Sequence, residues 1–142
     1  MRHSDIMSHF RGVKKTQYFT HTHEWIDFKN FTAYVGVCPF KLTGFDDVIE
    51  FDFEKTDVLL SQGEVIASFF CHNYRKDIFM PVDGKVKSFN EVLLLGNNEL
   101  ILEQPLGNGW LALIAPAVPS CCQGLLTHDE YQLKQRNRQW GG

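Results

Sequence analysis

The sequence predicts a small, mainly β domain of the sandwich or barrel type. Three observations support this: short runs rich in aromatic and β-branched residues recur along the chain, turn residues separate them, and helix signals are few and short. A chain of 142 residues with 44% apolar and 22% charged residues can bury the core that such a domain needs. We expect one domain over residues 17–134, with a flexible arm at residues 1–16 and a flexible tail at residues 135–142.

Strands and a short helix are predicted in the first third of the chain. Residues 17–28 carry aromatic and threonine side chains that favour one strand or a pair of short strands, and residues 31–37 favour the next strand after a turn. The segment 38–44 predicts one or two helical turns, because Pro39 suits the first helical position and Gly44 suits a helix end.

A β-hairpin is predicted over residues 63–86. Apolar residues flank a polar centre at residues 72–76, which is typical of a hairpin whose tip points into water. Function is therefore expected at this tip, and the flanking strands are expected to hold it in place.

Further elements complete the predicted domain. Ser120 with Gln123 and Thr127 with Glu130 have the form of capping boxes, so both predict a helix start, and the second helix is expected to fray from residue 134 onward. Strands are predicted at residues 48–53, 58–60, 86–90 and 110–114, and a short helix capped by Asn98 at residues 99–103.

The overall charge and the cysteine spacing exclude several classes of function. A net charge of −3 gives no bulk attraction to nucleic acid or to an anionic membrane, and no apolar run approaches the roughly 20 residues that span a bilayer. The four cysteines include one adjacent pair and no C-x-x-C spacing, so they predict neither a disulfide framework nor a zinc ribbon. Reduced thiols and the lack of an apolar signal region in residues 1–15 lead us to expect a cytoplasmic protein.

The sequence contains no pattern typical of a catalytic site. It has no Ser/His/Asp motif, phosphate-binding glycine loop or helix-borne carboxylate pair, so we expect no enzyme activity. His21 and His23 would share one face of a strand, and with Cys71 and His72 they form an alternative hypothesis of a metal-binding module. Cys71 and His72 would point to opposite faces of their strand, which argues against a nucleophile–base pair.

Several stretches, in order, are similar to the glycine cleavage system H-protein of the lipoyl/biotinyl-carrier superfamily. YFTHTHEW at residues 18–25 resembles the family's Y-[ST]-x-x-H-E-W, and VGV at residues 35–37 resembles its V-G-I. NNEL at residues 97–100 and PLGNGWL at residues 105–111 resemble its N-x-P/N-E-L…P-Y-G-x-G-W-L. Residues similar to its C-terminal helix are Ser120, Leu125, Leu126, Glu130 and Tyr131.

The resemblance implies a flattened β-barrel of two sheets with a protruding hairpin and short peripheral and C-terminal helices. In the family, a lysine at the hairpin tip carries lipoate in amide linkage. That arm takes an aminomethyl group from the glycine decarboxylase to the aminomethyltransferase, and the dihydrolipoamide dehydrogenase reoxidises it. The carrier itself catalyses nothing.

The chain departs from the family at the modified position. In the family's pattern, the modified lysine lies ten residues after a glycine and eight residues before a proline. In this chain, counting forward from Gly63 and backward from Pro81 leads to the same residue, Asn73. Asp77 matches the family's aspartate, whereas its glutamate three residues before the lysine is replaced by Phe70. An asparagine carboxamide cannot be acylated as a lysine amine can, so no cofactor is expected at this position.

The prediction is therefore an unlipoylated binding or regulatory homologue whose partners are proteins, either glycine cleavage enzymes or lipoate-handling enzymes. The alternative is a working lipoyl carrier modified at Lys76, the lysine nearest the tip; Lys41, Lys55, Lys85 and Lys87 are expected to be ordinary surface residues. The residues predicted to bind a partner are Phe70, Cys71, His72, Tyr74 and Arg75.

Overall fold

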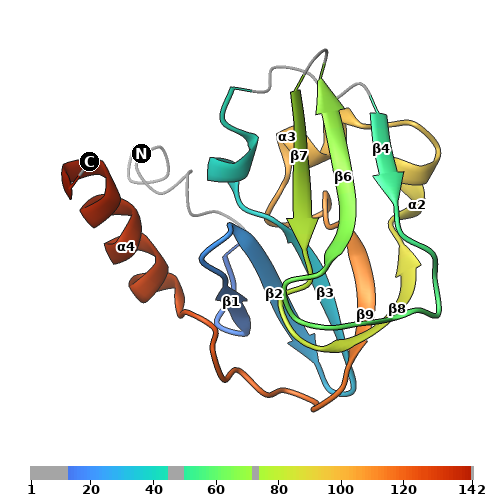
Figure 1. Ribbon diagram of the computed structural model, residues 1–142, viewed down its shortest axis with the longest axis horizontal. Helices are drawn as coiled ribbons and strands as arrows, with labels where there is room; N and C mark the ends of the chain where they lie inside the picture. The colour runs from blue at the N-terminus through green and yellow to red at the C-terminus, as the bar shows by residue number, and fades with distance from the viewer. Residues whose placement is uncertain (1–12, 45–49, 72–73, 142) are drawn as a thin grey trace, which may run out of the picture.

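The computed structural model describes residues 13–44, 50–71 and 74–141, with the backbone alone for Cys71 and for residues 137–141. Two antiparallel sheets enclose one core (Figure 1). The larger sheet has the strand order β1-β2-β3-β9-β8-β5 and the smaller one β4-β6-β7. The mainly β, sandwich-like fold expected from the sequence is confirmed. No helix in the described ranges is long and apolar enough to cross a membrane.

The strands of the larger sheet are β1 (Gln17–Phe19), β2 (Glu24–Lys29), β3 (Thr32–Val37), β5 (Leu59–Leu60), β8 (Gly84–Phe89) and β9 (Ala112–Pro116). Those of the smaller sheet are β4 (Glu50–Phe53), β6 (Val65–Cys71) and β7 (Tyr74–Phe79). The helices are the 3₁₀-helix η2 (Pro39–Leu42) and the α-helices α2 (Glu91–Leu94), α3 (Glu99–Glu103) and α4 (His128–Gly141).

Local sequence signals account for most of these boundaries. A pair of short strands, β1 and β2, forms from residues 17–29, and Asn30 makes the following turn in a left-handed conformation (φ 55°). Pro39 begins η2, as its fixed φ favours. Thr127 and Glu130 form the reciprocal capping box of α4, with Thr127 N–H donating to Glu130 Oε1 (2.9 Å) and Glu130 N–H to Thr127 Oγ1 (3.2 Å).

Other signals were misleading. Ser120 begins no helix; it adopts a left-handed φ of 56°, so its side chain is not placed to cap a following turn. Asn98 precedes α3 without a side-chain cap, whereas Asn90 caps α2 by accepting from Val92 N–H (3.1 Å). The backbone of α4 is helical to Gly141, and the flexibility expected from residue 134 onward stays a prediction. The start of the strand predicted at residues 48–53 lies outside the described residues.

Two apolar clusters hold the domain together. The main cluster lies between the sheets, where the alternation of the strands turns side chains such as Ile26, Ile114, Phe69 and Ile78 inward. A second cluster lies where α4 packs beside β1 and contains Phe19, Trp25, Cys38, Leu106 and Tyr131. The smaller sheet is thus packed against the larger one, and its hairpin extends from this packed base.

Gly36 and Gly109 are required by close packing. Gly36 pairs with Trp25 across β2 and β3, and a Cβ added at Gly36 would lie 2.4 Å from the indole ring. A Cβ at Gly109 would lie 2.5 Å from the carbonyl oxygen of Leu100. The ring of Trp25 is held further by its Nε1–H, which donates to the carbonyl of Pro105 (2.8 Å).

Candidate functional site

The β6–β7 hairpin projects from the domain (Figure 1), and its last described pair is Cys71 with Tyr74. Residues 72–73 join the two strands and lie outside the described residues, so the structure says nothing about His72 or Asn73 themselves. The Cys71 side chain is likewise not described. Tyr74 has 71% of its surface exposed, which makes it a large aromatic side chain available to a partner at this end of the molecule.

The two residues from which the modified position is counted, Gly63 and Pro81, lie close together at the base of the hairpin. Gly63 N–H donates to Met80 O (2.9 Å), and Met80 N–H donates to Glu64 O (2.7 Å), directly before Pro81. Gly63 has a φ of 89°, a left-handed turn conformation that favours glycine. The sequence count therefore starts and ends at residues that are neighbours in space.

The outer face of the hairpin carries a compact polar network. Arg75 donates from Nε to Asp77 Oδ1 (3.0 Å) and from a terminal nitrogen to Ser68 Oγ (3.1 Å), and Ser68 Oγ donates to Asp77 Oδ1 (2.7 Å). The guanidinium of Arg75 lies 5.6 Å from the ring centre of Phe70, its partner across the strands. The Ser68 hydroxyl, followed by Arg75, lowers the pKa of Asp77 below its ordinary value, although partial burial acts in the opposite sense. The ring of Phe70 is half-buried and is covered on one side by the Arg75 guanidinium.

Lys76 lies on the other face and is directed toward the domain. It pairs with Phe69, which is fully buried, and its Nζ donates to the carbonyl oxygen of Lys41 (2.8 Å). Partial burial lowers the pKa of Lys76, and the nearby positive charge of Lys41 lowers it further. The ammonium group of Lys76 is thus engaged with η2 below the tip.

A buried ion pair anchors the exposed edge of β7. The ammonium of Lys41 pairs with Glu24 Oε2 and donates to Thr22 O (2.9 Å), and both charged side chains are almost completely buried. The same Glu24 oxygen accepts from Phe79 N–H (3.1 Å), while its other oxygen accepts from Thr20 Oγ1 (2.7 Å). These contacts join β2, η2 and β7 at one point.

The surface position expected for Lys41 is wrong. The sequence predicts a surface position for each lysine away from the hairpin tip, because a lysine is rarely buried unless it is paired. Its partner Glu24 lies in the H-E-W stretch, and no spacing rule links the two residues across a turn and a strand. Only the close approach of β2 and η2 in three dimensions reveals the pair.

The two histidines predicted to share a strand face do not. His21 and His23 lie in the turn between β1 and β2, where His23 adopts a φ of 72° and His21 is exposed. His23 Nδ1 bonds to Tyr131 Oη (2.7 Å). Within the described ranges, no three His, Cys, Asp or Glu side chains are placed to hold a metal; His72 and the Cys71 side chain lie outside that test.

A second buried polar contact connects η2 to α4. Cys38, 1% exposed, hydrogen-bonds through its side chain to Tyr131, and burial raises its pKa to about 12. The thiol is therefore protonated and unreactive at neutral pH. No spacing in the sequence indicates this contact, because Cys38 and Tyr131 lie far apart along the chain.

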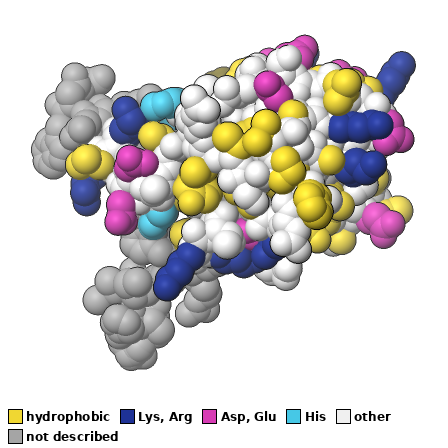
Figure 2. Space-filling model, turned by 90° about the horizontal axis from the view of Figure 1, so that it is seen from below, with side chains coloured by type: hydrophobic (Ala, Val, Ile, Leu, Met, Phe, Trp, Pro, Cys, Tyr) yellow, Lys and Arg dark blue, Asp and Glu magenta, His cyan; other side chains and the backbone are white. Residues whose placement is uncertain are grey.

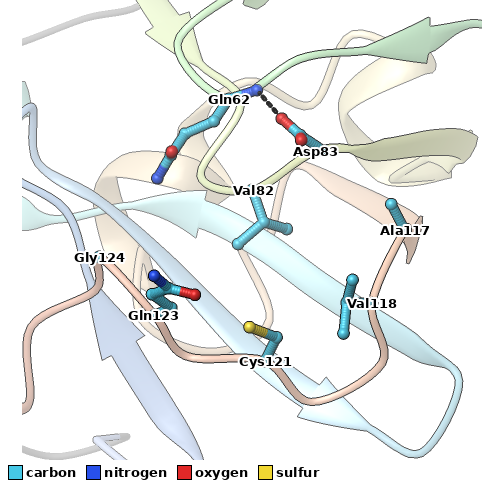
Figure 3. Close-up of a pocket in the computed structure, with 8 residues that line it drawn as sticks. All are labelled: Gln62, Val82, Asp83, Ala117, Val118, Cys121, Gln123 and Gly124. Carbon is cyan, nitrogen blue, oxygen red and sulfur yellow. Dashed lines mark hydrogen bonds between the residues drawn. The ribbon is translucent and has the colours of Figure 1, made fainter.

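The end opposite the hairpin tip offers no comparable chemistry. Figure 2 shows hydrophobic side chains exposed in the middle of this face, with side chains of both charges around its edge. A hollow of about 380 Å³ here is lined by Val82, Val118, Cys121 and the carboxamides of Gln62 and Gln123 (Figure 3). Its one carboxylate, Asp83, accepts from Gln62 N–H (2.7 Å).

Fold and site together define a class of protein. A hairpin projects from a two-sheet β domain, and the described part of that hairpin carries structural ion pairs and hydrogen bonds rather than a nucleophile with its base. This two-sheet arrangement with an extended hairpin is the architecture that the sequence resemblance implies for a lipoyl-carrier domain.

Comparison with known proteins identifies the family. The family model for the glycine cleavage H-protein matches residues 17–138. The glycine cleavage system H protein of Salinibacter ruber is 30% identical over 80% of this chain and 91% of its own length, and that of Bacteroides thetaiotaomicron is 31% identical over 80% and 90%. A crystal structure of a glycine cleavage system H protein from Mycobacterium marinum covers 87% of this chain and 99% of its own, with a TM-score of 0.75 at 21% identity. The chain belongs to the glycine cleavage H-protein family.

Proposed function

We propose that this chain is an H-protein homologue that carries no lipoyl group and acts by binding other proteins through its hairpin. The observation that carries the proposal is the asparagine at the position where the family's lysine is modified. A carboxamide offers no amine for acylation, so the carrier chemistry of the family has no attachment point at Asn73.

The hairpin geometry supports the count along the sequence. Gly63 and Met80 are bonded at the base, and the described pairing ends with Cys71 opposite Tyr74, so the two-residue connection contains Asn73. A register slip that moved Lys76 to the connection would also break its pairing with Phe69 and expose that fully buried ring.

The setting of Lys76 argues against its use as a substitute. An acylated lysine must extend into an enzyme's active site, but the Lys76 amine is bonded to the Lys41 carbonyl on the domain side of β7. Its lowered pKa does increase the neutral, nucleophilic fraction of the amine, so lipoylation at Lys76 is retained as a second candidate function.

Intact-mass spectrometry after co-expression with a lipoate ligase and lipoate tests the proposal. The natural chain should keep its unmodified mass. The double variant Phe70→Glu, Asn73→Lys, which restores both family residues, should gain one lipoyl group and so proves that the ligase works on this hairpin. A lipoyl gain in the natural chain that disappears in Lys76→Arg would establish the carrier alternative instead.

The proposed docking surface comprises Phe70, Cys71, His72, Tyr74 and Arg75. Tyr74 supplies an exposed aromatic ring and Arg75 a planar cation, and these two residue types often dominate binding energy at interfaces. Glycine cleavage enzymes or lipoate-handling enzymes are the proposed partners. Binding of each purified enzyme should weaken in Tyr74→Ala and stay unchanged in Phe31→Ala, a matched control that removes an aromatic ring with 76% exposure outside the hairpin.

The metal alternative has a separate test. If His21, His23, Cys71 and His72 formed a metal-binding module, the purified protein would contain stoichiometric zinc, iron or copper. His23 is already bonded to Tyr131, and His21 faces solvent in a turn, so we expect elemental analysis to find no stoichiometric metal.

A further inference from the structure

A cavity unrelated to the hairpin lies where α4 meets β1 and η2. Its volume is about 400 Å³, within the range of roughly 300–1,000 Å³ typical of small-molecule sites. The walls are apolar: Phe19 and Leu106 are buried in the second core cluster, and Pro39 and Phe40 extend the apolar surface outward. Such walls favour a ligand with a hydrocarbon body.

Among the described lining residues, the long polar side chains all come from α4. His128, Gln132, Gln135 and Arg136 lie along one side of the helix and form the polar boundary of the cavity. Gln135 Nε2 donates to Tyr131 Oη (3.4 Å), whereas within the described residues no hydrogen bond or ion pair of Gln132 or Arg136 competes with a ligand. An apolar interior with a polar boundary on one side suits an amphipathic molecule.

The charge of this boundary selects the polar end of the ligand. None of the described residues that line the cavity is acidic, although the chain as a whole has a net charge of −3. Burial lowers the pKa of His128, which leaves Arg136 as the permanent cation, and no ion pair in the described part of the chain involves Arg136. The acidic residues of the first turn, Asp129 and Glu130, do not line the cavity. An exposed guanidinium at an apolar opening favours a carboxylate.

We infer that this cavity binds a small carboxylic acid with an apolar body, its carboxylate at Arg136 and its hydrocarbon against Phe19 and Leu106. At about 30 Å³ per non-hydrogen atom, the share of a water molecule in the liquid, the volume admits at most about a dozen such atoms. A straight-chain acid of about eight carbons meets this limit. The inference does not depend on whether the hairpin is lipoylated.

Calorimetry tests the inference by titrating three compounds into the full-length protein: octanoate, octanamide and butyrate. Octanoate should bind, and butyrate, four methylenes shorter, should bind roughly 200-fold more weakly, since each buried methylene contributes about fourfold. Octanamide keeps the chain but lacks the charge and should bind about tenfold more weakly than octanoate. NMR shifts on octanoate binding should centre on Leu106 and Tyr131.

Two variants on α4 test whether the charge of Arg136, rather than any positive charge on the helix, binds the carboxylate. Arg136→Gln should weaken octanoate about tenfold and leave octanamide unchanged. Lys134→Gln removes an exposed charge from the same helix outside the cavity and should change neither affinity. Equal binding of octanoate and octanamide to the natural chain, or an unchanged octanoate affinity in Arg136→Gln, would overturn the inference. Binding that requires deletion of residues 1–12 would also overturn it, because the chain itself would then be the occupant.

Discussion

Replacing Lys41 by Met should destabilise the protein by an amount that depends strongly on pH. The substitution keeps most of the side-chain volume but removes the cation from Glu24, whose carboxylate is 0% exposed and keeps only hydrogen bonds such as that from Phe79 N–H. Breaking a buried pair in this way typically costs about 3–5 kcal/mol, because one charge is left buried without its partner.

The cost has an upper limit, because the unpaired Glu24 carboxylate can take up a proton and become neutral. Protonating a glutamate of ordinary pKa near 4.3 costs about 3.7 kcal/mol at pH 7 but only about 1 kcal/mol at pH 5, at 1.36 kcal/mol per pH unit. In the variant the unfolded chain loses this proton at a lower pH than the folded chain does, so stability falls as pH rises above about 4.3. We therefore expect a loss of about 3–4 kcal/mol at pH 7, or roughly 10 °C in Tm, and about 1 kcal/mol at pH 5.

Urea unfolding followed by tryptophan fluorescence at both pH values measures these losses. The double variant Glu24→Gln, Lys41→Met removes both charges and should recover most of the stability lost at pH 7, since no buried charge remains. A loss below about 1 kcal/mol at pH 7, or an equal loss at the two pH values, would show that Lys41 does not neutralise Glu24 in the folded protein.

Three further predictions concern other contacts. Thr127→Ala should lower stability by about 1 kcal/mol and reduce the helical circular dichroism signal, while Ser120→Gly should not lower stability, because Ser120 caps nothing and has a left-handed φ. Native-state alkylation at pH 8 with peptide mapping should label the exposed Cys122 and leave Cys38 unlabelled, since the Cys38 pKa is about 12; equal labelling rates would contradict its burial. Ser68→Ala should raise the pKa of Asp77 toward its ordinary value, which an NMR titration measures. In the natural chain, charged Asp77 stabilises the fold above about pH 4, and this stabilisation is lost as pH falls through the lowered pKa. In the variant, the stabilisation should be lost at a higher pH.

The elements that sequence predicted well are those set by local chemistry. The β6–β7 hairpin follows from apolar flanks around a polar centre, η2 from Pro39, and α4 from the capping box at Thr127. In each case the signal and the structure lie within a few residues of one another. The same logic fails at Ser120, where a local pattern is overridden by a left-handed backbone.

The contacts that sequence missed all join distant segments. Glu24 meets Lys41 only because η2 folds back against β2, and Cys38 meets Tyr131 only because α4 packs beside β1. No periodicity or spacing in one sequence encodes such pairs. The outer-face network is intermediate. Arg75 and Asp77 share one face of β7 because side chains alternate along a strand, whereas their bonding to Ser68 depends on the pairing of β7 with β6.

The central claim is that this homologue works without a lipoyl group at its hairpin, and it is tested most directly on the protein isolated from its natural source. Tryptic peptides spanning residues 56–85 report both Asn73 and Lys76, because acylation of Lys76 blocks cleavage after it. The account predicts an unmodified Asn73 peptide and free cleavage after Lys76. A lipoyl-bearing peptide that begins at Lys76 and continues to Lys85 would contradict it.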